Sequence, residues 1–287
     1  MYQIVHNFRH DEALRRSFNE LAEATFGLNF ENWYQNGFWS DCYDPYSLLV
    51  DGKIVANVSL NRTDLCIDGQ VKRVYQLGTI MTAEEYRRRG YIRAIMEEIN
   101  KDIPDGDGVY LFANDSVLDF YPKFGFQQGK EFVYSRTVEQ TDQRTMENVP
   151  MNGPTDWAQL QKAMDENTFR SACHMEGNSG LIFFYVSQFM KDCIWFSKEL
   201  NAWAIAEIEG DQLILHNIFC PHDISEDAVI AAFGPDIKGV TLGFSPADPT
   251  GYTCHALQEE NTTFFVKGEL FRDFENQKLR IPSLSHA

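Results

Sequence analysis

Residues 71–103 constrain the fold most, because they read as a strand, a basic glycine loop and a helix in direct succession. Residues 71–82 are rich in β-branched and aromatic side chains, and Gly78 within them indicates a bulge or a close backbone approach. A strand followed at once by a helix predicts a fold that mixes α-helices with a β-sheet. The helix is indicated by apolar residues at the spacing of one helix face, namely Ile92, Ile95, Met96, Ile99 and Ile103.

Three arginines and a glycine, Arg87 to Gly90, stand where this helix begins. Cations are unfavourable at the positive end of a helix dipole, so we expect an anionic group to compensate them. The free backbone N–H groups of a helix start bind phosphate, a glycine lets the ligand approach closely, and arginines favour a diphosphate. The alternative is a solvated charge run that neighbouring glutamates balance, namely Glu84, Glu85, Glu97 and Glu98.

The segment 80–92 resembles motif A of the GCN5-related N-acetyltransferases (GNAT), whose arginine-or-glutamine, x, x, glycine, x, glycine-or-alanine loop binds the pyrophosphate of coenzyme A. Residues 87–91 match this motif, and Ile92 departs from the small residue usual at its last position. Further along, GVYLFA at 108–113 fits a buried strand, and NDSVLDFYPKFGF at 114–126 resembles motif B, with its tyrosine, basic residue and Gly-Phe pair. Two motifs in order predict the GNAT fold, a mixed, mostly antiparallel sheet flanked by helices.

This resemblance implies that acetyl-CoA is the co-substrate, and the spacing of the cysteines and histidines indicates no metal cofactor. The pantetheine arm is expected between strands 71–82 and 108–113, which a bulge at Gly78 would hold apart. By the same resemblance Tyr121 protonates the departing thiolate; the alternative is a tyrosine that packs motif B against the core. The expected cofactor-binding residues are Ile80, Met81, Thr82, Arg87, Arg88, Arg89, Gly90, Tyr91 and Asn114.

An aromatic and acidic stretch at residues 30–46 is the candidate acceptor site. Aromatic faces attract ammonium groups and carboxylates pair with them, so an amine would be held here. The alternative is a helix pair that closes over the core. The candidate acceptor-binding residues are Trp33, Trp39, Asp41 and Tyr43.

The acidic balance of the chain, with a formal net charge of -17, opposes binding to nucleic acid and suits a cationic, amine-bearing acceptor. No segment approaches the ~20 uninterrupted apolar residues that a membrane span needs, and no signal-like apolar core stands near the N-terminus. We therefore expect a cytoplasmic protein without membrane contact. The cysteines are widely spread and contain no CxxC pair, so neither a disulfide framework nor a zinc site is indicated.

The second half of the chain repeats the order hairpin, helix, strand at residues 203–219, 226–233 and 239–244. It carries no arginine-glycine loop, and we expect residues 264–271 to supply its closing strands. The chain therefore divides into a catalytic GNAT domain (1–138), a polar, proline-bearing linker (139–154) and a degenerate GNAT-like domain (155–287).

Tandem domains of this kind resemble the enhanced-intracellular-survival type acetyltransferases. That family usually carries a third, sterol-carrier-like domain, for which this chain is too short. In that family the terminal carboxylate reaches the active site, which makes Ala287 a candidate base; the alternative is a closing segment of the second domain.

The sequence thus predicts an N-acetyltransferase that moves an acetyl group from acetyl-CoA to a primary amine of a cationic small molecule or peptide. Direct attack in a ternary complex is expected, because no cysteine lies in either motif to form an acyl-enzyme. The alternatives are a non-catalytic acyl-CoA sensor that recruits a partner and a protein that binds another phosphorylated ligand. The oligomeric state is left open.

Overall fold

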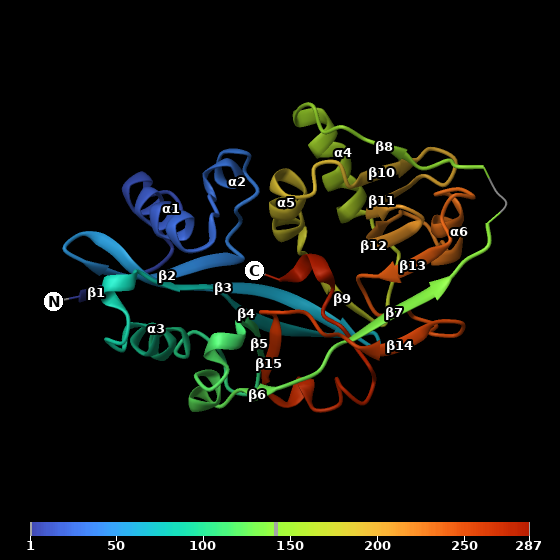
Figure 1. The fold of residues 1–287 in the computed structure, drawn as a ribbon. Coiled ribbons are helices and arrows are strands. Elements are labelled where there is room, and N and C mark those ends of the chain that lie inside the picture. The colour runs from blue at the N-terminus through green and yellow to red at the C-terminus, as the bar shows by residue number, and fades with distance from the viewer. Residues whose placement is uncertain (1, 141–142, 287) are drawn as a thin grey trace.

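The structure is a computed structural model that describes residues 2–140 and 143–286, and it contains two sheets side by side (Figure 1). In each sheet most neighbouring strands are antiparallel and one pair is parallel. This confirms the predicted mixed, mostly antiparallel architecture. The first sheet has the order β1 (Tyr2–Val5), β2 (Tyr43–Val50), β3 (Lys53–Ile67), β4 (Gln70–Thr82), β5 (Gly108–Ala113), β15 (Thr263–Lys267) and β6 (Gln127–Gln128), with β9 (Cys173–Glu176) paired to β3.

Helices cover both faces of the first sheet (Figure 1). Helices α1 (Glu12–Phe26) and α2 (Glu31–Gln35) pack on one face, and α3 (Tyr91–Ile99) packs on the other. The side chain of Asp11 accepts a hydrogen bond from the N–H of Leu14 and so caps α1. The apolar face predicted for α3 is buried at Ile95, Met96 and Ile99.

The second sheet also lies between helices. Helix α6 (Glu226–Ala231) packs on one face, and α4 (Pro154–Asp165) and α5 (Ser179–Gln188) pack on the other. The strand order is β14 (Thr253–Ala256), β7 (Phe132–Thr137), β13 (Gly239–Leu242), β12 (Gln212–Phe219), β11 (Ala202–Glu209), β10 (Ile194–Ser197) and β8 (Glu147–Asn148).

The predicted repeat is present in this second sheet. The hairpin β11–β12 leads through α6 into β13, which runs parallel to β12, just as the hairpin β3–β4 leads through α3 into β5, which runs parallel to β4. The same order of hairpin, helix and parallel strand therefore builds the centre of both sheets.

The two sheets exchange strands. Strand β7 belongs to the second sheet, where it pairs with β13 and β14, although β6 just before it lies in the first. Strand β15 lies in the first sheet, between β5 and β6. The expectation that residues 264–271 close the second sheet was wrong, because Phe264 and Phe265 are buried in apolar clusters of the first. No single cut in the chain separates the sheets, and the domain division at residue 138 stays a prediction.

Candidate active site

The strands β4 and β5 are paired only over the first part of β4. Their parallel register runs from Val74 opposite Gly108 to Leu77 opposite Leu111 and ends there, whereas β4 continues to Thr82. The main chain of residues 78–82 therefore has no strand partner on the β5 side.

A bulge in β4 begins where this pairing ends. Gly78 lies opposite Ser59 and Met81 lies opposite Asn57, so two residues of β4, Thr79 and Ile80, face one residue of β3. Thr79 has a φ of 47°, in the left-handed region. Bulges of this kind bend a strand and end its pairing, and the sequence prediction of a bulge at Gly78 agrees with this geometry.

A cavity of about 590 Å³ lies beside the splayed end of β4. Its walls come from β4, from the end of α1, from the loop before α3 and from the segment after β5. The predicted cofactor residues that line it are Ile80, Met81, Thr82, Arg87 and Asn114, and Tyr121 lines it as well. Sequence reasoning missed the apolar contribution of Phe26 and Leu28, which no motif marks.

The loop before α3 leaves its amides free. Gly90 is the N-cap of α3 with a φ of 79° and no side-chain cap, and the N–H of Ala94 makes the first helical bond, to the Gly90 oxygen. The three N–H groups of residues 91–93 therefore have no partner within the helix. A Cβ built at Gly90 would meet nothing within 4 Å, so the space over this helix start is open.

The arginines of this loop make only local contacts. Arg87 donates from Nε to the Thr82 oxygen at 3.3 Å, and Arg89 donates from Nη2 to the Glu85 oxygen at 2.8 Å. Within the described part of the chain, none of Arg87, Arg88 and Arg89 forms an ion pair. The alternative of a charge run balanced by neighbouring glutamates therefore has no support in these contacts.

Tyr121 begins the short helix η3 (Tyr121–Phe124) and is buried, with 4% of its surface exposed. Its ring packs on Phe126 and Phe265, as the structural alternative expects, and the residue also lines the cavity. Burial raises the pKa of its hydroxyl to about 12. A phenol with this pKa is protonated at neutral pH and is able to donate a proton.

The residues predicted to bind an acceptor lie elsewhere, and none of them lines this cavity. Trp33 and Trp39 are buried, and their indole N–H groups donate to the Gly180 and Tyr43 oxygens at 2.8 and 2.9 Å. Asp41 is exposed and pairs with Arg9 at 2.8 Å. Packing over the core accounts for the two tryptophans, so an acceptor contact at this group stays a prediction.

Tyr43 is the one member of that group with a link to the cavity. It is buried, and its hydroxyl lies 2.6 Å from the Thr79 Oγ1, at the bulge of β4. Burial raises the pKa of this hydroxyl to about 12. Tyr43 therefore supports the bulge, and its contact with an acceptor stays a prediction.

The C-terminal segment lies on the first sheet. Ala287 is outside the described residues, but His286 before it stacks on Phe112, which lines the cavity. Tyr185 donates from its hydroxyl to the His286 oxygen at 2.6 Å, and Tyr110 donates to the Ser285 oxygen at 3.1 Å. Burial lowers the pKa of His286 to about 3, so its imidazole is neutral.

Glu131 anchors the same segment, and nothing in the sequence marked it. This buried carboxylate accepts a hydrogen bond from the N–H of Ile281 at 2.8 Å. Burial raises its pKa to about 7, against the opposing effect of Arg280.

Among residues 2–140 and 143–286, no group of three or more His, Cys, Asp or Glu is placed to hold a metal ion. No helix in these residues is long and apolar enough to cross a membrane.

The chain resembles solved structures along most of its length. Residues 10–129 match the family described as acetyltransferase (GNAT) domain. A probable N-acyltransferase from Enterococcus faecalis V583 superposes with a TM-score of 0.62 at 14% identity, over 93% of this chain and 72% of that one. Eis1 from Mycobacterium abscessus superposes with a TM-score of 0.58 at 13% identity, over 93% of this chain and 73% of that one. A GCN5-related N-acetyltransferase from Kribbella flavida superposes with a TM-score of 0.55 at 14% identity, over 93% of this chain and 72% of that one.

Among curated proteins no match was found. The likeness to these solved structures covers both mixed sheets and shows that the chain shares their fold. Residues 10–129 thus match a GNAT acetyltransferase domain, and this match supports an acyltransferase of the N-acetyltransferase type. The resemblance predicted from the two sequence motifs is thereby confirmed.

Proposed function

We propose that this protein moves an acetyl group from acetyl-CoA to a primary amine of a cationic acceptor, by direct attack in a ternary complex. One observation carries the proposal: a single cavity brings Tyr121 together with the unpaired end of β4 and with Arg87 at the start of α3.

The residues present fit coenzyme A. The free N–H groups at the start of α3 and the arginines Arg87, Arg88 and Arg89 would hold the pyrophosphate, with Gly90 leaving the space above them open. The main chain of residues 80–82, which has no partner on β5, would hydrogen-bond the pantetheine arm, and Asn114 lines the same cavity. When bound, acetyl-CoA supplies the acetyl thioester.

An acid and a base are needed for the transfer. A lysine-like amine with a pKa of about 10.4 is neutral in only roughly one molecule in 2,500 at pH 7, so neutralising it costs about 4.6 kcal/mol. Tyr121 would donate its proton to the departing thiolate, because its raised pKa keeps the hydroxyl protonated. The carboxylate of Ala287 stays the predicted base.

The negative net charge of the chain favours a cationic acceptor. With a net charge of -17, long-range attraction draws cations rather than anions to the protein. We therefore expect amines with a further positive charge, small molecules or peptides, to be better acceptors than anionic amines.

A calorimetric titration with acetyl-CoA tests the proposal, with ADP as the control ligand. We expect micromolar binding that the double variant Arg88→Ala, Gly90→Pro loses, because proline cannot adopt the φ of 79° at position 90. The matched control is Arg16→Ala, a solvent-exposed arginine on α1. Folded protein that does not bind acetyl-CoA would overturn the proposal.

A second measurement separates transfer from sensing. Acetyl-CoA binding followed by release of CoA with at least one cationic amine supports the enzyme. Binding without release for any amine tested would favour the alternative of a non-catalytic acyl-CoA sensor.

A further inference from the structure

The cavity beside β4 draws its lining from both faces of the first sheet. On the face that α3 covers, Ile80, Phe120 and Tyr121 line the cavity and pack with the apolar cluster that contains Ile95 of α3. The loop that carries Arg87 leads directly into α3, so the proposed pyrophosphate site lies on this face as well. The coenzyme therefore accounts for the α3 side of the cavity.

On the opposite face, three apolar side chains line the same cavity. Phe26 is the last residue of α1, and Leu28 packs with the apolar cluster under that helix. Phe112 of β5 points away from the α3 face, because its neighbour Leu111 is buried there and successive side chains of a strand alternate. Phe26, Leu28 and Phe112 are called the apolar wall below. The predicted acid–base segment reaches the same face, since His286 stacks on Phe112.

Apolar surface is left uncovered around this cavity. Phe26 is 41% exposed, and so is Val117, which follows β5 and also lines the cavity. Exposed apolar side chains gathered around one cavity are typical of a ligand-binding site. A ligand that covers the apolar wall would remove this surface from water.

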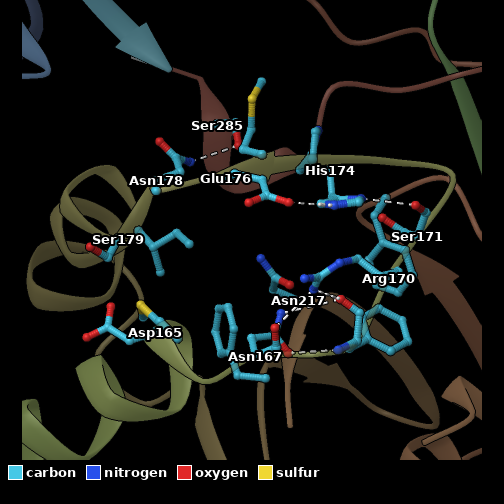
Figure 2. Close-up of a pocket in the computed structure, with 18 residues that line it drawn as sticks. Asp165, Asn167, Arg170, Ser171, His174, Glu176, Asn178, Ser179, Asn217 and Ser285 are labelled. Carbon is cyan, nitrogen blue, oxygen red and sulfur yellow. Dashed lines mark hydrogen bonds and ion pairs between the residues drawn. The ribbon is translucent and has the colours of Figure 1, made fainter. Parts of the chain in front are cut away.

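The cavity offers no countercharge for a second cation. Among the described residues that line it, Arg87 is the one charged side chain, and it belongs to the proposed pyrophosphate site. Ionisable groups gather instead in another cavity, of about 330 Å³, where Figure 2 shows Arg170, His174 and Glu176. The two cavities share no lining residue. A positive charge other than the reacting amine would therefore be desolvated without a partner beside β4, which is strongly unfavourable.

We propose that the acceptor is a primary amine on an apolar stem, alkyl or aromatic, and that the stem lies on the apolar wall. This inference rests on the proposed function and adds the chemistry next to the amine. The amine nitrogen bonds to the acetyl carbon as the C–S bond breaks; the base takes the proton of the amine, and Tyr121 gives one to the thiolate. A further positive charge on the acceptor has to lie beyond the stem, in solvent, where the net charge of -17 favours it.

Two amines of equal size test the proposal. n-Hexylamine and 1,5-diaminopentane differ only in the methyl or ammonium group at the end remote from the reacting amine. We expect n-hexylamine to have a kcat/KM about tenfold higher or more, because its methyl group needs no countercharge. From ethylamine to n-hexylamine, kcat/KM should rise about threefold to fourfold for each added methylene. Equal or better transfer to the diamine would overturn the inference.

Variants of the apolar wall locate the stem. Leu28→Glu places a carboxylate in the wall and should shift the preference toward 1,5-diaminopentane by about tenfold, a change that lost packing alone does not produce. Phe26→Ser should raise the KM for n-hexylamine and leave the Kd for acetyl-CoA unchanged. The matched control is Phe189→Ser, at the end of α5, because Phe189 is 57% exposed and does not line this cavity. Folded variants with the amine preference of the wild type would overturn the inference.

A longer acyl chain is the other occupant that the apolar wall would accept. The ratio of kcat/KM for hexanoyl-CoA to that for acetyl-CoA, measured with n-hexylamine, should be the same in Phe26→Ser and in the wild type. A lower ratio in the variant would assign the wall to the acyl group and overturn the inference.

The outcomes separate this inference from the proposed function. Acetyl transfer to amines without a preference for the apolar stem overturns the inference alone. Absence of transfer to every amine of the series, by protein that is folded, overturns the proposed function and the inference with it.

Discussion

The imidazole of His286 stacks on the ring of Phe112, with ring centroids 3.7 Å apart and planes 21° from parallel. Phe112 lies on β5 and lines the cavity beside β4, so the end of the described chain reaches the wall of the candidate active site. Contacts from β5 and α5, through Tyr110 and Tyr185, hold it there. Residues far apart in sequence therefore shape one site.

Deleting residues 285–287 should lower kcat by about 10²-fold or more, the range of a lost acid–base group, while acetyl-CoA binding is retained. The deletion removes His286 and the predicted base Ala287 but leaves β4 and the loop before α3. Turnover with a cationic amine and calorimetry with acetyl-CoA are the measurements.

The matched control is Tyr185→Phe, which removes the bond to the His286 oxygen and keeps the terminal residues. We expect a smaller loss of kcat from it. Unchanged turnover in the folded deletion variant would show that this segment supplies no catalytic base.

Tyr121→Phe should lower kcat by about 10²-fold without changing the Kd for acetyl-CoA. The substitution keeps the ring that packs on Phe126 and Phe265 and removes only the proton donor. Tyr34→Phe, at the surface beside His10, is the control. Equal turnover of Tyr121→Phe and wild type would leave Tyr121 a packing residue.

Gly90→Ala should weaken acetyl-CoA binding by about tenfold. An L-residue at positive φ costs about 1–2 kcal/mol, and relief of that strain would move the free amides of the helix start. Gly210→Ala is a matched control, because Gly210 has a φ of 64° and open space around it, in the β11–β12 turn.

Both glycine variants should lose similar stability in urea unfolding, and only Gly90→Ala should lose binding. If Gly210→Ala weakened acetyl-CoA binding to the same extent, the effect would be one of general stability rather than of the loop.

Glu131→Gln should remove a pH dependence of stability. The folded pKa is about 7 against an ordinary 4.5, so the folded state binds the proton more tightly than the unfolded state does. The contribution of this group to stability is therefore full below pH 4.5 and is lost as the pH rises to about 7. At 1.36 kcal/mol per pKa unit the loss is about 3 kcal/mol.

Urea unfolding at pH 5 and pH 8 measures this effect, as the difference between wild type and Glu131→Gln. The variant can still accept from the N–H of Ile281, so it isolates the charge. We expect the free energy of unfolding of Glu131→Gln, relative to that of the wild type, to be higher at pH 8 than at pH 5. A difference that does not change with pH would contradict a raised pKa at Glu131.

Local features of the fold could be predicted from the sequence. The spacing from Ile92 to Ile99 predicts the buried face of α3, because helix periodicity depends only on neighbouring residues. Gly78 marks the start of the bulge, and Gly90 marks the helix start, where its φ of 79° favours glycine. The sequence motifs named Arg87 and Tyr121, but their meeting in one cavity depends on tertiary packing.

Burial and partner choice were decided only by the tertiary structure. The aromatic stretch with Trp33 and Trp39 suits an amine site or a core equally well in composition, and only packing buried both indoles. The strand containing Phe264 is apolar enough for either sheet, and the free edge of β5 determined where it paired. Sequence patterns reflect the conformational preferences of residues that are close together in the chain. Contacts between distant segments depend instead on which apolar surfaces stay exposed after the local elements have formed, and the sequence pattern does not specify these.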